Sequence, residues 1–327
     1  MRATPPGGLG EGPADDAGSL MRVAVVGDCT LDVTARTDAP PIVGGDVPAQ
    51  ISLGPGGQGG NVAVRLARAG IGVRLAAAIA DDAAGQLLAS ALEAEGVALA
   101  RLPADRSGTV VALLDAAGER AMLSDRVTLD SRPIGSAVAG AEWVHCSGYP
   151  LADDATGDAL AALLGALPAA VRVSMGGGSL PDDPDRARRV RARIEAAGVR
   201  LLVLSRDEAG ALLARNLPSL PAAADALAGT FPDAIVVVTG GALGSSAAGR
   251  GFALSVPAQD PAVPVVDATG AGDAYAAGLI GRLLDVAWPP DVAALRAAME
   301  AGSRLGGLVS RVRGAQGSVA GETGGGA

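Results

Sequence analysis

The sequence predicts an α/β fold of three layers, in which helices cover both faces of a mainly parallel sheet and a small β-sheet lid is added. Short runs of valine, isoleucine and leucine alternate with helical stretches, as expected for buried parallel strands. The chain has 327 residues, of which 49% are hydrophobic, enough for one large core. Because only 2% are aromatic, that core must be packed mainly with aliphatic side chains and alanine.

The alternation of strands and helices begins at residue 21. A buried strand at 21–28 precedes a helix at 59–70, a strand at 73–82 and a helix at 83–97, and both helices end near glycine. Four more strand-like runs follow, at 141–149, 171–178, 199–205 and 233–241. Trp143, His145 and Cys146 lie in one of these runs, and we expect all three side chains to pack in the core.

Two regions, 29–54 and 106–126, interrupt this alternation. Both contain short pieces in which polar and apolar residues alternate, and the second has a hairpin pattern around Ala117 and Gly118. We expect these regions to form the lid of a single domain that spans 21–318.

The two ends of the chain have a different composition. Residues 1–20 have no hydrophobic stretch, which predicts a disordered leader and not a signal peptide, and residues 319–327 predict a flexible tail.

Composition excludes several classes of function. The net charge of −9 argues against nucleic acid or an anionic membrane as a partner. The absence of lysine rules out a P-loop and Schiff-base chemistry. Cys29, Cys146 and His145 are too few for a structural zinc site, and two unpatterned cysteines suit a reducing cytoplasm. No apolar run approaches the roughly 20 residues of a membrane span.

Asp273 is the first candidate for chemistry. It follows Gly270, Ala271 and Gly272 at the start of a predicted helix, where backbone N–H groups and the helix dipole favour an anion. A carboxylate beside such an anion hole is placed to remove a proton from a hydroxyl. The alternative is that Asp273 is only a helix N-cap.

Two separated motifs resemble the signatures of one family. The sequence DATGAGD (267–273) resembles the C-terminal signature of the ribokinase-like, or PfkB, carbohydrate kinases, and GGQGGNVAVRLARAG (56–70) resembles their N-terminal motif. GDCTLD (27–32), TVVALLDAAGER (109–120), VVVTGGALGS (236–245) and RGAQGS (313–318) follow in the same order. The resemblance extends from Arg22 to Ser318 and implies a ribokinase-like fold, often dimeric through the lid.

The resemblance assigns catalytic roles at the C-terminal signature. It implies that Asp273 is the base and that the N–H groups of 270–272 form the anion hole. Asp267, Thr269 and Ser318 match positions around a monovalent-cation site, which suggests K⁺. The alternative for Asp267 is a turn or capping residue.

The family uses the other end of the chain to hold the sugar. In this sequence the candidates are Asp28, Asp32, Gly56, Gly57, Gln58 and Asn61. The alternatives are a turn residue for Asp28 and a solvated lid residue for Asp32. Arg126 would reach a carboxylate or phosphate of the substrate, or else lie on the surface.

Further matches to the family indicate which residues bind the nucleotide. Thr239, Gly241 and Gly244 match the loop that meets ATP. Ser205 stands where the family often has asparagine, and Glu208 is expected to organise Mg²⁺ through water, or else to be only a first-turn helix acid. A second departure is VSMGGGS (173–179), where relatives commonly have an Asp-Pro pattern.

The resemblance therefore implies a kinase that uses ATP to phosphorylate a hydroxyl of a small sugar. A nucleoside acceptor is weakly disfavoured, because residues 1–142 contain no aromatic side chain to stack on a base. The two departures also leave open a catalytically weak sugar or nucleotide sensor. A Rossmann dehydrogenase is excluded, since no Gly-x-Gly-x-x-Gly follows the first strand.

Overall fold

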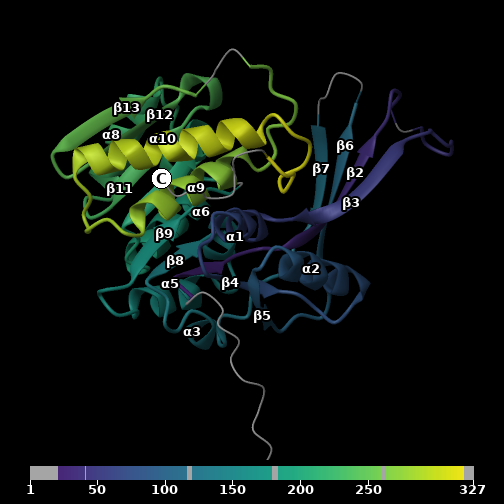
Figure 1. Ribbon diagram of the computed structural model, residues 1–327, viewed down its shortest axis with the longest axis horizontal. Helices are drawn as coiled ribbons and strands as arrows, with labels where there is room; N and C mark the ends of the chain where they lie inside the picture. Colours follow the sequence, from purple (N-terminus) through teal and green to yellow (C-terminus); the bar gives the residue numbers. More distant parts are fainter. Residues whose placement is uncertain (1–20, 41, 116–119, 179–182, 260–262, 320–327) are drawn as a thin grey trace, which may run out of the picture.

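The computed structural model describes residues 21–40, 42–115, 120–178, 183–259 and 263–319 (Figure 1). The leader predicted at 1–20, the hairpin tip at 117–118 and all but the first residue of the predicted tail lie outside the described residues.

The main layer is a sheet that joins most of the chain. Its strands are β1 (Val23–Val26), β4 (Val73–Ala78), β5 (Ala98–Leu102), β8 (Trp143–Cys146), β9 (Arg172–Met175), β10 (Leu201–Ser205), β11 (Ile235–Thr239), β12 (Ser245–Gly249) and β13 (Phe252–Val256). Within the described residues they lie in the order β13-β12-β11-β10-β9-β8-β1-β4-β5. At one edge, β12 pairs antiparallel with both β11 and β13. All the pairs from β11 to β5 are parallel. The predicted mainly parallel sheet is therefore confirmed.

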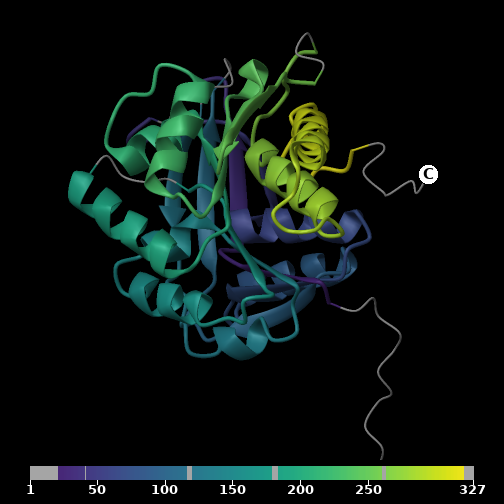
Figure 2. The same cartoon turned by 90° about the vertical axis from the view of Figure 1, so that its left-hand side faces the viewer.

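Helices cover both faces of this sheet, as Figure 2 shows. One face carries α3 (Ile134–Ala137), α4 (Gly148–Ala152), α5 (Gly157–Gly165), α6 (Pro184–Ala196), α7 (Arg206–Leu213) and α8 (Leu220–Thr230). The other carries α1 (Gln58–Arg68), α2 (Ala83–Ala94), α9 (Ala271–Leu283) and α10 (Val292–Val309), and a short 3₁₀ turn, η1 (Gly241–Leu243), follows β11. The strand expected at 73–82 is shorter than predicted, because Asp82 caps α2 by accepting a hydrogen bond from the Gly85 amide.

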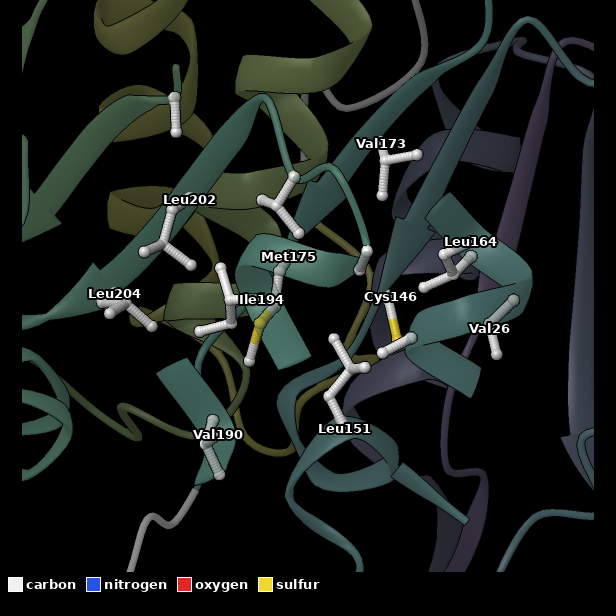
Figure 3. Close-up of a cluster of buried hydrophobic side chains, with 14 of the residues drawn as sticks. Val26, Cys146, Leu151, Leu164, Val173, Met175, Val190, Ile194, Leu202 and Leu204 are labelled. Carbon is white, nitrogen blue, oxygen red and sulfur yellow. The ribbon is translucent and has the colours of Figure 1, made fainter. Parts of the chain in front are cut away.

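The core has one apolar cluster on each side of the sheet. Leu151, Leu164, Val190 and Ile194 from the helices meet strand residues such as Val173 in the first cluster (Figure 3). Aliphatic side chains and alanine make up most of both clusters, as predicted. Trp143, His145 and Cys146 are fully buried in β8, which confirms their assignment to the core.

The lid is a separate sheet that projects from the main layer beside α1 and α2 (Figure 1). It consists of β2 (Thr30–Arg36), β3 (Gln50–Gly56), β6 (Gly108–Leu114) and β7 (Arg120–Asp125), in the order β3-β2-β6-β7. Both predicted lid segments are thus present, although β3 continues beyond residue 54 to Gly56.

The pairing register gives the two faces of the lid different characters. Residues opposite each other share a face. One face, here the apolar lid face, is apolar except for Thr109 and Asp125 at the end nearest the main sheet. Its apolar residues include Val33, Ala35, Ile51, Leu53, Val111, Leu113, Ala121 and Leu123. The other, here the Asp32 face, includes Asp32, Thr34, Arg36, Gln50 and Ser52. We expect the polar side chains of the Asp32 face to point toward a ligand or solvent.

None of the helices in the described part of the chain is both long and apolar enough to cross a membrane.

Candidate active site

Asp273 lies in the first turn of α9 and does not cap it. The N-cap is Gly270, with a positive φ of 77°, and no side chain donates to or accepts from this terminus as a cap. Asp273 occupies the third helical position, and its Oδ2 accepts a hydrogen bond of 2.7 Å from Nδ2 of Asn61. The alternative reading of Asp273 as an N-cap is therefore wrong, and the two family signatures meet at this contact.

The surroundings of Asp273 favour its protonated form. Desolvation raises the pKa of its carboxyl group to about 7, opposed by the hydrogen bond from Asn61. The negative charges of Asp28 and Glu208 raise this pKa further, whereas a hydrogen bond from Gln58 lowers it. A carboxyl group that exchanges its proton near neutral pH is suited to general-base catalysis.

The predicted anion hole is only partly open. The Ala271 N–H donates to the Ala268 carbonyl at 3.2 Å. In the part of the chain that the structure describes, the amides of Gly270 and Gly272 have no backbone acceptor. Two of the three predicted donors thus remain at the positive end of a 13-residue helix.

A tight turn brings α1 toward the end of β1. Gly57, the N-cap of α1, has a φ of 84°, and a Cβ atom there would lie 2.7 Å from the carbonyl oxygen of Asp28. Gln58, predicted to touch substrate, instead accepts a hydrogen bond from the Gly148 amide and donates to Asp273. Gln58 therefore helps to hold the Asp273 carboxyl group in position.

Asp28 and Arg126 bind each other. Their side chains form an ion pair, Ser147 Oγ donates to Asp28 at 3.2 Å, and the Arg126 guanidinium stacks 3.8 Å above the Tyr149 ring. Asp28, Arg126 and Tyr149 border a cavity of about 170 Å³ that is also lined by Asp153. The surface alternative for Arg126 is wrong, because this side chain is packed beside the end of β1.

Asp32 lies on the other side of the site, in the lid. It accepts a hydrogen bond from Thr30 Oγ1 at 2.8 Å, and a Cβ atom at Gly56 would overlap its carboxylate. Gly56 is thus a glycine because it makes room for Asp32. The Asp32 face borders a groove of about 910 Å³ whose far wall includes Thr269 and Gln316.

The predicted nucleotide residues line one pocket. Thr239, Gly241 and Gly244 border a cavity of about 200 Å³ together with Ala271 and Gly272 of the predicted anion hole. A nucleotide in this pocket would therefore have its phosphates beside the N-terminus of α9 and within reach of Asp273.

Ser205 and Glu208 cap the start of α7. Ser205 Oγ accepts from the Glu208 amide at 3.2 Å, and Glu208 Oε2 accepts from the Ser205 amide at 2.7 Å, which is a capping box. Glu208 Oε1 accepts from the Gly178 amide, and a Cβ atom at Gly177 would overlap the same carboxylate. Gly177 and Gly178 of the glycine-rich departure thus allow the backbone to approach the Glu208 carboxylate closely.

Asp267 has the contacts of a turn residue. Its Oδ1 accepts from the Thr269 amide at 2.9 Å and from Thr269 Oγ1 at 2.6 Å, and its Oδ2 accepts from the Gly314 amide. Ser318 is exposed near the groove. Among the described residues, no group of three or more His, Cys, Asp or Glu side chains is arranged to hold a metal ion.

Two residues near the base were not predicted. Gln316 donates from Nε2 to Asn61 Oδ1 at 3.1 Å. Arg65, on α1, is only 1% exposed and donates to the carbonyl oxygens of Ala315 and Gly317. The sequence held one signal for Arg65, since it follows Asn61 by one helical turn and so shares its face.

Comparison with known proteins places this chain in one family. A profile of the pfkB family carbohydrate kinases matches residues 21–320. A fructokinase of Klebsiella pneumoniae is 28% identical over 309 residues, covering 90% of this chain and 94% of the relative. A fructokinase of Salmonella typhimurium is 27% identical over 303 residues, with the same coverage.

Solved structures share the fold. Ribokinase from Thermotoga maritima superimposes with a TM-score of 0.72 at 18% identity, covering 91% of this chain and 96% of that one. Fructokinase from Vibrio cholerae O395, solved with fructose, ADP and calcium ion, gives 0.72 at 24% identity, covering 91% and 95%.

Proposed function

Because the chain belongs to the pfkB family of carbohydrate kinases and is therefore an ATP-dependent sugar kinase, we propose that its general base is Asp273 and its acceptor a small ketose such as fructose. The observation that carries this proposal is the 2.7 Å contact between Asn61 and Asp273, beside an open helix N-terminus that borders the nucleotide pocket. Base, anion hole and nucleotide pocket then converge on one reacting hydroxyl.

In the proposed reaction, the Asp273 carboxylate accepts the proton of the sugar hydroxyl as its oxygen attacks the γ-phosphorus of ATP. The bond between γ-phosphorus and the bridging oxygen breaks, and ADP leaves with the electron pair. The amides of Gly270 and Gly272 donate hydrogen bonds to the oxygens of the transferred group, whose charge they stabilise. Most of the rate enhancement then comes from positioning and electrostatics.

Magnesium belongs to the same proposal. The acidic side chains nearest the base, Asp28 and Glu208, already accept hydrogen bonds from the protein, so they fit a metal ion held largely by phosphate oxygens and water. When bound, Mg²⁺ would supply positive charge beside the phosphates. A monovalent cation near Asp267, Thr269 and Ser318 stays a prediction.

The acceptor is inferred from the relatives and from the lid. Both curated relatives named above are fructokinases. Asp32 offers carboxylate oxygens to sugar hydroxyls from one side of the site, and the Asp28–Arg126 pair offers polar atoms from the other. Tyr149 lies beside that pair, but the Arg126 guanidinium already covers its ring, which argues against a stacked nucleobase there.

We also propose that two copies pair through the apolar lid face. Ile51, Leu53 and Leu123 on this face are 67%, 60% and 63% exposed. Leu53 and Leu123 lie at opposite edges of the lid, and the paired residues Val33 and Val111 connect them in one apolar row. A continuous exposed apolar face of this kind is unfavourable in a monomer. The free thiols of Cys29 and Cys146 suit the cytoplasmic location that forms part of the proposal.

A substrate screen tests the proposal. The purified protein is given ATP, Mg²⁺ and, in turn, fructose, ribose, a ketohexonate and adenosine, with ADP release and product mass as readouts. We expect fructose to have the highest kcat/KM and Asp273→Asn to abolish product formation. A higher kcat/KM for adenosine would replace the sugar by a nucleoside, and saturable sugar binding with no product from any acceptor would favour a sensor.

A further inference from the structure

The loop after α10 contacts both signature segments of the proposed catalytic centre, at Gly270 and at Asn61. This loop, residues 313–318, packs Ala315 against the anion hole, where a Cβ atom at Gly270 would lie 2.6 Å from the Ala315 Cβ. The Gly314 amide donates to Asp267 Oδ2 at 3.0 Å, which ties the loop to the turn before α9. The loop is therefore a wall of the site and not a connection to the tail alone.

Within this loop, Gln316 determines which way the Asn61 amide faces. Gln316 Nε2 donates to Asn61 Oδ1 at 3.1 Å, and Asn61 Nδ2 donates to Asp273 Oδ2 at 2.7 Å. A side-chain amide has its acceptor and donor on opposite sides, so a donor that occupies Oδ1 directs the NH₂ group toward the carboxylate. If the amide turned over, its oxygen would face Asp273 and favour the protonated carboxyl group.

Two arginines of α1 hold Gln316 in place by binding the backbone on either side of it. Arg65 Nη2 donates to the Ala315 carbonyl at 2.6 Å and to the Gly317 carbonyl at 3.0 Å. Arg68 Nη2 donates to the Gln316 carbonyl at 2.9 Å, and its guanidinium also forms an ion pair with Glu95. Buried hydrogen bonds to charged donors are stronger than neutral ones, so they fix the loop firmly.

We propose that Gln316, held by Arg65, is a positioning residue that keeps the Asn61 amide oriented to stabilise the ionised form of Asp273. The proposal rests on the proposed role of Asp273 as base. In this proposal the C-terminal loop helps to set the pH range of the reaction. The hydrogen bonds run from Arg65 on α1 to the loop, from Gln316 in the loop to Asn61, and from Asn61 to Asp273 on α9.

Other groups also act on Asp273 and must stay constant in a test. The carboxylates of Asp28, at the end of β1, and Glu208, at the start of α7, disfavour its ionised form. Asp28 is itself paired with Arg126, and Gln58 donates to Asp273 from α1. A change at Gln316 leaves all four of these residues in place.

The test compares the pH profile of kcat/KM for the sugar in Gln316→Met and Gln316→Glu with that of the wild type. Methionine removes the donor at nearly constant volume, whereas glutamate places acceptors opposite Asn61 Oδ1 and turns the amide over. We expect the acidic limb to move to higher pH, by about one pH unit for Gln316→Glu and less for Gln316→Met. Below the midpoint a shift of one unit lowers the rate about tenfold, and the rate recovers at alkaline pH.

Gln86→Met, at an exposed site on α2, is the matched control and should leave the profile unchanged. Arg65→Met should shift the limb in the same direction as Gln316→Met, because it releases the loop. Thermal unfolding and ATP binding show whether each variant is folded, and Gln316→Met alone suffices if Gln316→Glu does not fold.

An equal loss of rate at all pH values, with no shift of the limb, would mean that Gln316 has only a structural role, and the proposal would be wrong. If Asp273→Asn kept the wild-type rate, the proposed function itself would fail, whatever the Gln316 variants do. The two failures are therefore distinguishable.

Discussion

Replacing Asp273 by asparagine should abolish activity and at the same time stabilise the folded protein at alkaline pH. The two effects have one cause, because the site that desolvates the carboxylate makes it a useful base and also disfavours its charge. A helix acid kept only for stability would behave in the opposite way, since a negative charge in the first turn of a helix is favourable.

The size of the stability effect follows from the pKa. Folding raises the pKa of Asp273 from 3.8 to about 7. Between these values the folded state holds a proton that the unfolded state has lost, so this group makes stability fall as pH rises through the interval. The difference of about three pH units corresponds to about 4 kcal/mol at most, and because Asp273 is partly exposed, solvent screening reduces the expected gain to about 1–3 kcal/mol.

Urea unfolding of wild type and Asp273→Asn at pH 5 and pH 8.5 measures this gain. We expect asparagine to stabilise the protein more at pH 8.5 than at pH 5. Asp158→Asn is the control, since Asp158 lies in the first turn of α5 and its pKa is lowered by its hydrogen bond with Arg193. That variant should be less stable than the wild type at both pH values. A loss of stability at pH 8.5 on Asp273→Asn, like that of the control, would contradict the reasoning.

Two further substitutions test the anion hole and the lid. Gly270→Ala should lower the free energy of unfolding by about 2–5 kcal/mol, because of the left-handed backbone and the overlap with Ala315, and should also lower kcat. The control is Gly198→Ala, where φ is 62° and no atom lies within 4 Å of the added Cβ. It should lower the free energy of unfolding by only about 1–2 kcal/mol. Equal costs in urea unfolding would mean that Ala315 makes no close contact. Leu123→Glu, on the apolar lid face, should convert the dimer to a monomer, as measured by light scattering. Val292→Glu, at an exposed position of α10, is the control and should leave the dimer intact. A monomeric wild-type protein would refute the pairing.

The sequence predicted the architecture because local signals agree with the fold. Valine-rich runs between helical stretches correspond to the parallel strands, and alternating polarity in the two interrupting regions corresponds to the lid. Gly57 and Gly270 were named from the motifs, and the structure gives the physical reason for glycine at both positions: each adopts a positive φ where a loop turns into a helix that borders the site.

Contacts between distant residues were not predictable in the same way. Asn61 and Gln316 are 255 positions apart, and no local pattern states that their amides meet. The ion pair of Asp28 with Arg126 is equally hidden, because either side chain taken alone is typical of a surface. Ser205 and Glu208 have the spacing of a capping box, and a sequence interpretation of that spacing alone favours the helix terminus over the metal.

The role of Arg65 could have been predicted in part from its spacing relative to Asn61. Asn61, Arg65 and Arg68 are separated by four and three positions, so their side chains lie on one face of α1. A helix packed against a sheet rarely buries a guanidinium unless something accepts its hydrogen bonds, and Arg65 is 1% exposed with two loop carbonyls as acceptors. The same face therefore binds Asp273, the proposed base, through Asn61 and the C-terminal loop through Arg65. A substitution at Arg65 must accordingly change the position of Gln316 before it changes anything at the sugar, and its effect should appear in the pH profile before it appears in KM.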